Sequence, residues 1–96
     1  MHNAGDHRDH YQKAITLAES ALAIDPEAFA VWGNLASYYA GLGDQEARGA
    51  IERALALRSD DVYVIYDAAV VMARLNEHSE AGRFLDQLQA MGYSES

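Results

Sequence analysis

The sequence Ala-Leu-Ala-Ile-Asp at residues 21–25 returns 33 positions later as Ala-Leu-Ala-Leu-Arg at residues 54–58. Beyond the next turn the shift grows to 34, because the stretch 43–47 is one residue shorter than the stretch 76–81. A length change confined to a turn is typical of a structural repeat, because loops tolerate insertions. The shift of 33 also places Phe29, Val31 and Trp32 on Val62, Val64 and Ile65.

Apolar residues in each copy recur every three or four positions, which places them on one face of a helix. Aspartate and glycine residues between the apolar runs supply N-caps and C-terminal stops. The pattern predicts five helices. They span residues 11–24, residues 26–41 with Pro26 in the first helical position, residues 45–57, residues 62–75 and residues 78–91.

The segment Val-Tyr-Val-Ile-Tyr at residues 62–66 contradicts this pattern locally, because β-branched and aromatic residues favour strands. Two observations favour a helix instead. The segment aligns with the helix predicted to begin near Glu27, and the apolar run to Leu75 is longer than a typical strand. We therefore predict a helix here.

The spacing of large and small residues resembles the tetratricopeptide repeat. That family carries large-x-x-Leu-small-x-x-Tyr on the first helix of a unit and Ala-x3-large-x2-Ala on the second. The middle unit shows both motifs, the last unit shows variants of both, and the first unit shows the second motif before the family's Asp25-Pro26. The matching residues are Trp32, Leu35, Ala36, Tyr39, Ala47, Ile51, Ala54, Ile65, Ala68, Ala69, Met72, Ala81, Leu85, Leu88, Ala14, Ala18 and Ala21.

The resemblance implies an all-α fold of antiparallel helix pairs, stacked as a short right-handed solenoid of five helices. Residues 9–92 would form a single domain, with a half repeat at 9–25 and full repeats at 27–58 and 61–92. Residues 1–8 are expected to be disordered or frayed, and residues 93–96 to form a C-terminal tail. Because the first helix of the first repeat is missing, one expectation is that the chain is a fragment of a larger multidomain protein.

Composition excludes several functional classes. The 96 residues suffice for one domain, and 7 Lys and Arg against 15 Asp and Glu give a formal net charge of −8. Nucleic acid and anionic membranes are not expected as partners of so acidic a chain. The absence of cysteine excludes disulfides and thiolate catalysis. The first residues are too polar for a signal peptide and no apolar run reaches membrane-spanning length, so we expect a cytoplasmic protein.

No motif indicates an enzyme. The Gly-x-Gly at residues 41–43 lacks the lysine and third glycine of a phosphate-binding loop. The two aspartates at residues 60–61 lie at a predicted helix start, where capping explains them. His7 and His10 have a spacing that could hold a divalent metal, but a solvated terminus is the preferred interpretation. We predict no catalytic residue, no metal and no cofactor.

In tetratricopeptide arrays the first helix of each pair lines a concave groove. The resemblance therefore implies a non-catalytic interaction module that binds a peptide segment or helix of a partner protein. Small residues in the middle unit leave room for a ligand, and tyrosines in the last unit provide contact area. The predicted groove residues are Asn34, Ser37, Gly41, Tyr63, Tyr66, Val70 and Arg74.

The family's best-known ligand mode is a carboxylate clamp, in which lysines and an arginine hold an acidic C-terminal tail. The corresponding positions here are Gly33, Ser37, Tyr66 and Val70, and only Asn34 fits the clamp. A net charge of −8 also disfavours an acidic ligand. We therefore do not expect this mode.

A stripe of large apolar residues on the last helix supports an alternative function. Phe84, Leu88 and Met91 share one helix face and are expected to be exposed, because no further helix follows them. The alternative is a self-assembling structural or regulatory unit that forms a homodimer through its incomplete repeat ends.

Overall fold

Five helices make up the described chain. The computed structural model describes residues 4–92, with side chains from residue 7 onward. Within this range the chain is all-helical without a strand, which confirms the predicted all-α class, and no helix in it is long and apolar enough to cross a membrane. The helices are α1 (Ala4–Ile24), α2 (Phe29–Gly41), α3 (Glu46–Leu57), α4 (Val62–Arg74) and α5 (His78–Ala90).

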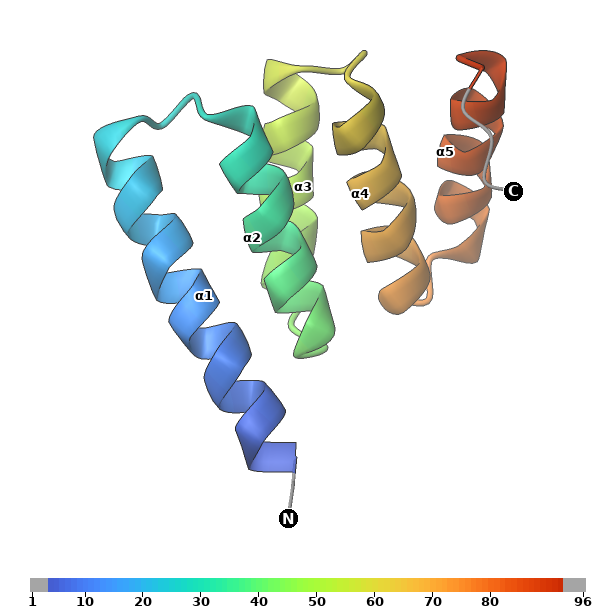
Figure 1. Cartoon of the computed structure of the whole chain (residues 1–96). Coiled ribbons are helices and arrows are strands. Elements are labelled where there is room, and N and C mark those ends of the chain that lie inside the picture. The colour runs from blue at the N-terminus through green and yellow to red at the C-terminus, as the bar shows by residue number, and fades with distance from the viewer. Residues whose placement is uncertain (1–3, 93–96) are drawn as a thin grey trace.

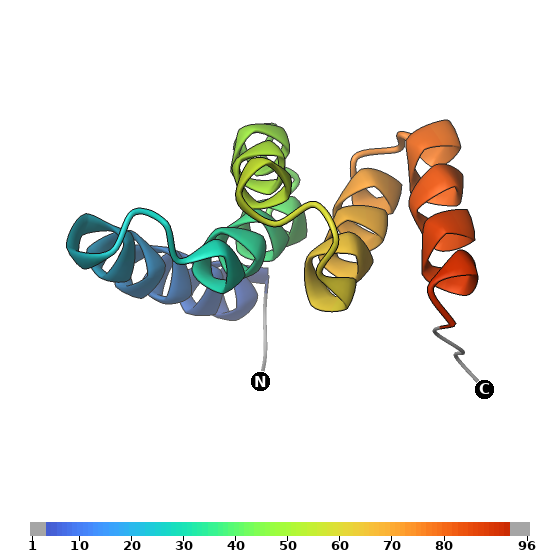
Figure 2. The ribbon, with the colours of Figure 1, turned by 90° about the horizontal axis from the view of Figure 1, so that it is seen from above.

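Helix α2 lies at the centre of the arrangement. Consecutive helices run antiparallel (Figure 1). Helix α2 packs against α1, α3 and α4, while α4 also packs against α3 and α5. Seen from above, α3 lies behind α2, and α1 and α4 flank α2 (Figure 2). One side of α2 therefore remains without a covering helix among the described residues.

Alanine makes up much of the core. Ala36, Ala47, Ala54 and Ala68 are fully buried, and such small side chains let helix axes approach closely. Among the described residues no polar or charged side chain is buried. The space between the alanines is filled by Val64, Val71, Ile51, Ile65 and Met72. The inward positions predicted from the 3.6-residue period are therefore confirmed in α3 and α4.

The turns show capping chemistry at three places. The Asp61 carboxylate accepts hydrogen bonds from the backbone N–H groups of Tyr63 (2.9 Å) and Val64 (3.2 Å) and so caps α4. Gly43 and Asn76 have φ values of 71° and 65°, the left-handed conformation that ends a helix. Local capping therefore sets the ends of α2 and α4.

The strand-like segment 62–66 is helical, as predicted. Its first turn is capped by Asp61, and Val64 and Ile65 are buried against neighbouring helices. Tertiary packing of the apolar face therefore outweighs the strand preference of β-branched residues.

The predicted start of the second helix is wrong. Helix α2 begins at Phe29, and Pro26 lies in a turn rather than in the first helical position. The Asp25 carboxylate accepts a hydrogen bond from the Glu27 N–H (3.1 Å), which stabilises a turn at this point. The indole N–H of Trp32 donates to the Pro26 carbonyl (2.8 Å) and holds the turn against the helix.

Helix α1 begins at Ala4, earlier than the predicted start of the domain at residue 9. Residues 4–14 contain no proline and no β-branched side chain, so a helix nucleated by packing further along can extend through them. Residues 4–8 of the segment expected to be frayed are thus helical. Residues 1–3 and the predicted tail at 93–96 lie outside the described residues.

Candidate functional site

A cleft of about 440 Å³ lies between α2 and α4. Both helices contribute residues to it, and the N-cap residue of α4, Asp61, also lines it. No residue of α3 is among its lining residues. Its lining consists of Phe29, Ala30 and Asn34 from α2, and Asp61, Tyr63, Val64 and Asp67 from the α4 segment.

Tyr63 is the most exposed aromatic residue of the cleft, with 77% of its surface accessible. Its backbone position is fixed, because its N–H donates to the Asp61 carboxylate in the first turn of α4. An exposed tyrosine on a rigid helix offers contact area at a low cost in conformational entropy. Tyr63 therefore has the properties of a binding residue.

Asp67 lies one helical turn after Tyr63 and is half-buried. Burial raises the pKa of its carboxyl group above the ordinary value, and repulsion from Asp61 raises it further. Its Oδ2 atom occupies space that a side chain on Gly33 would need, since a Cβ there would lie only 2.7 Å from it. The absence of a side chain at Gly33 therefore makes room for Asp67.

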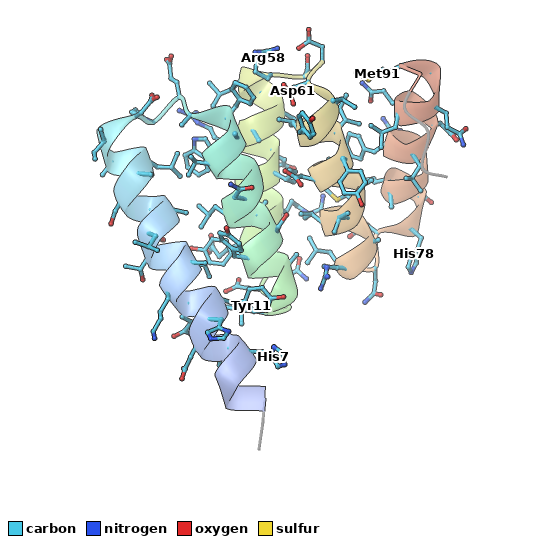
Figure 3. The ribbon with its side chains drawn as sticks, in the orientation of Figure 1. His7, Tyr11, Arg58, Asp61, His78 and Met91 are labelled. Atoms are coloured by element: carbon cyan, nitrogen blue, oxygen red, sulfur yellow. The ribbon has the colours of Figure 1, made fainter. Side chains whose placement is uncertain are left out.

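Arg58 contacts two residues that line the cleft, Phe29 and Asp61, but it does not line the cleft itself. Its guanidinium carbon lies 4.9 Å from the centre of the Phe29 ring, a cation–π distance. The same guanidinium lies 3.4 Å from the Asp60 carboxylate and 4.0 Å from that of Asp61. Figure 3 shows Arg58 and Asp61 together at this end of the molecule. Arg58 therefore offsets part of the charge of Asp61.

A second hollow of about 260 Å³ lies between α1 and α2. Its lining is mainly apolar and comprises Ala14, Leu17, Ala18 and Ala21 from α1, and Val31, Asn34 and Tyr38 from α2. Asn34 is exposed and lines both hollows, so the two lie on the same side of α2. We call this surface, formed by the linings of the two hollows, the front face.

Asn34 and Tyr63 are the two predicted groove residues that line the cleft. Ser37, Tyr66 and Val70 are half-buried and Arg74 is exposed, and none of these four lines either hollow. The structure therefore brings together a smaller set than the predicted one.

Gly41, another predicted groove residue, lies against Tyr11 of α1. A Cβ on Gly41 would lie 2.5 Å from the Tyr11 ring, so the room that a ligand was expected to use is filled by this chain. Figure 3 shows Tyr11 of α1 beside the C-terminal end of α2.

The sequence analysis did not select Asp67, because its position on α4 does not match the family's ligand positions. Its spacing of four residues from Tyr63 was the available signal.

On α5, the prediction that Phe84, Leu88 and Met91 form an exposed apolar stripe is wrong for Leu88. Leu88 is only 2% exposed, because it shares with Ala81 the face of α5 that packs inward. Phe84 is half-buried against the core, and Met91 is 43% exposed. The most exposed large aliphatic residues of the described chain are Leu17 (72%) and Ile24 (87%), one heptad apart on α1.

The side of α1 and α2 that faces α3 carries a polar contact. The hydroxyl of Tyr39 donates to the Glu19 carboxylate at 3.1 Å and joins α2 to α1. Burial raises the pKa of Tyr39, and this hydrogen bond raises it further. A shallow hollow of about 290 Å³ here is lined partly by core residues such as Leu22 and Leu35. We interpret this region as a packing contact.

His7 and His10, whose spacing could hold a divalent metal, both lie near the start of α1 and are exposed. Among the described residues no group of three or more His, Cys, Asp or Glu side chains is placed to hold a metal ion.

Compared with protein-family models, curated proteins and solved structures, the chain matches none of them. The relation to tetratricopeptide proteins therefore stays a prediction based on the residue pattern.

Proposed function

We propose that this chain is a non-catalytic protein-interaction module of the tetratricopeptide type, and that it binds a peptide segment or helix of a partner protein on the front face. The observation that carries the proposal is the open cleft between α2 and α4, in which Tyr63 is 77% exposed. A large aromatic residue at the mouth of a cleft is a frequent anchor of protein interfaces.

The chemistry of the front face supports this function. Aliphatic, aromatic, amide and carboxylate groups line its two hollows. Such a surface offers apolar pockets for side chains together with an amide, Asn34, that can bond a backbone. The hollows flank Asn34, so an extended segment or a helix laid across α2 could contact both.

The pattern of helix contacts supports the proposal of a tetratricopeptide-type module. The two helix pairs predicted as repeats are α2 with α3 and α4 with α5, and each pair packs internally. The first helices of the two pairs also contact each other, as do α3 and α4. Stacking of this kind builds a core from neighbouring units alone.

The test is a comparison of Tyr63→Ala with Leu85→Ala. Both residues are exposed, at 77% and 49%, but Leu85 lies on α5 and outside the front face. We expect a partner retained from an extract of the source cells by the wild-type chain to be lost with Tyr63→Ala and kept with Leu85→Ala. Circular dichroism would confirm that both variants fold. Equal recovery with the two variants would refute the proposed site.

Homodimer formation is a second candidate function, favoured by the exposure of Leu17 and Ile24 on α1. Two such side chains one heptad apart would gain about 1.5–3 kcal/mol each on full burial. Sedimentation velocity over a wide concentration range tests it. A dimer that Ile24→Asp dissociates would support this function, and a wild-type monomer at the highest concentration would exclude it.

A further inference from the structure

The two hollows of the front face differ in charge. The hollow between α1 and α2 is lined by apolar side chains apart from Asn34 and the hydroxyl of Tyr38. The cleft between α2 and α4 contains the carboxylates of Asp61 and Asp67. None of the described residues that line the cleft is a lysine or an arginine. The front face thus combines an apolar end with an acidic end.

Of the two carboxylates, Asp67 is the one available to a ligand. Asp61 caps two backbone N–H groups of α4 and lies 4.0 Å from Arg58. Within the described residues no hydrogen bond or ion pair reaches the Asp67 carboxylate. It is half-buried, and both burial and the charge of Asp61 raise its pKa. A cation placed beside it would favour the charged form of the carboxylate and so oppose both effects.

Tyr63 and Asp67 are four residues apart and therefore lie on the same face of α4, one turn from each other. A cationic side chain entering the cleft could stack on the Tyr63 ring and approach the Asp67 carboxylate. Arg58 already makes the same kind of contact with Phe29, one of the residues that line the cleft. The cleft thus offers an exposed aromatic ring and a carboxylate. Within the described residues this carboxylate has no hydrogen-bond or ion-pair partner.

We propose that the partner segment inserts a lysine or arginine side chain between Tyr63 and Asp67, and an apolar side chain into the hollow between α1 and α2. This inference rests on the proposed function and specifies its ligand as a basic, amphipathic segment of a partner protein. Charge complementarity carries it, because the chain has a net charge of −8 and the cleft is acidic.

The experiment titrates the ¹⁵N-labelled chain with two peptides, N-acetyl-Leu-Ala-Ala-Arg amide and the same peptide with citrulline in place of arginine. Citrulline keeps the shape of the side chain and removes its charge. We expect the arginine peptide to shift the backbone amide signals of Asn34, Tyr63 and Asp67. It should bind about fivefold or more tightly than the citrulline peptide, as one partly desolvated charge contact implies.

Two variants assign the effect. Asp67→Asn should abolish the preference for arginine, whereas Asp86→Asn, which removes an exposed carboxylate on α5, should leave it unchanged. Tyr63→Leu keeps apolar area without the aromatic ring and should weaken the preference. Equal binding of both peptides in the cleft would overturn the inference and leave the proposed function standing. No shift at these amides with either peptide would also overturn it, and the pull-down with Tyr63→Ala would then decide the proposed function separately.

Discussion

The two sides of α2 use small residues in opposite ways. On the side toward α3, Ala36 is fully buried and lets the helices approach closely. On the other side, Gly33 and Gly41 make room for Asp67 and Tyr11, which come from neighbouring helices. The inner side therefore stabilises the fold, and the front face leaves Asn34 and Tyr63 exposed. We infer that stability and binding can be changed separately on this helix.

The largest expected effect is the loss of stability when a buried side chain is truncated. Ile51 of α3 is fully buried, whereas Leu17 of α1 is 72% exposed. We expect Ile51→Ala to lower the free energy of unfolding by about 2–4 kcal/mol, because it removes buried methyl groups and leaves a cavity. Leu17→Ala should change it by less than about 0.5 kcal/mol. Urea denaturation measures both, and similar losses in the two variants would contradict the proposed difference.

Asp61 makes the comparison sharper, because it borders the cleft but its carboxylate stabilises the fold. It caps the N–H groups of Tyr63 and Val64. Asp61→Ala should lower the free energy of unfolding by about 1 kcal/mol through loss of the cap. Asp61→Asn keeps a capping oxygen and should cost less. If Asp61→Ala left the thermal midpoint unchanged, the cap would not matter for stability.

Removing the charge of Asp67 should raise the free energy of unfolding at neutral pH, whereas removing that of Asp61 should lower it. Because the pKa of Asp67 is raised, the folded chain binds the proton more tightly than the unfolded chain, and ionisation of Asp67 destabilises the fold. Asp67→Asn should therefore raise the free energy of unfolding at pH 7 by less than about 1 kcal/mol, since solvent screens a half-exposed charge. The gain should vanish at a pH below the ordinary value of 3.8, where both states are protonated. Denaturation at both pH values would measure it, and a loss of stability at pH 7 would contradict the account.

Periodicity in the sequence predicted the five helices and most of their inward positions. It could not predict the start of α2, because the proline rule for a first helical position competed with a turn stabilised by Asp25. It placed Phe84, Leu88 and Met91 on one face, but a helical period does not tell which face is covered, and Leu88 is buried.

The candidate site was predictable in part. Asn34 and Tyr63 were predicted from the groove positions that the tetratricopeptide resemblance implies, and both line the cleft. Gly33 and Gly41 were recognised as small, yet only the packing of α1 and α4 shows that side chains of this chain fill the space beside them. Asp67 was missed because its importance depends on its burial beside Gly33, a contact between residues of two different helices.

The most direct test of the central claim is the substitution Asn34→Arg. Asn34 is exposed and lines both hollows of the front face, and arginine is a better helix former than asparagine. We expect the free energy of unfolding to change by less than about 0.5 kcal/mol. The affinity for the partner recovered with the wild-type chain should fall about tenfold or more, because the new side chain fills the hollows and repels a basic ligand. An unchanged affinity in a folded Asn34→Arg variant would contradict the claim that the front face of α2 binds the partner.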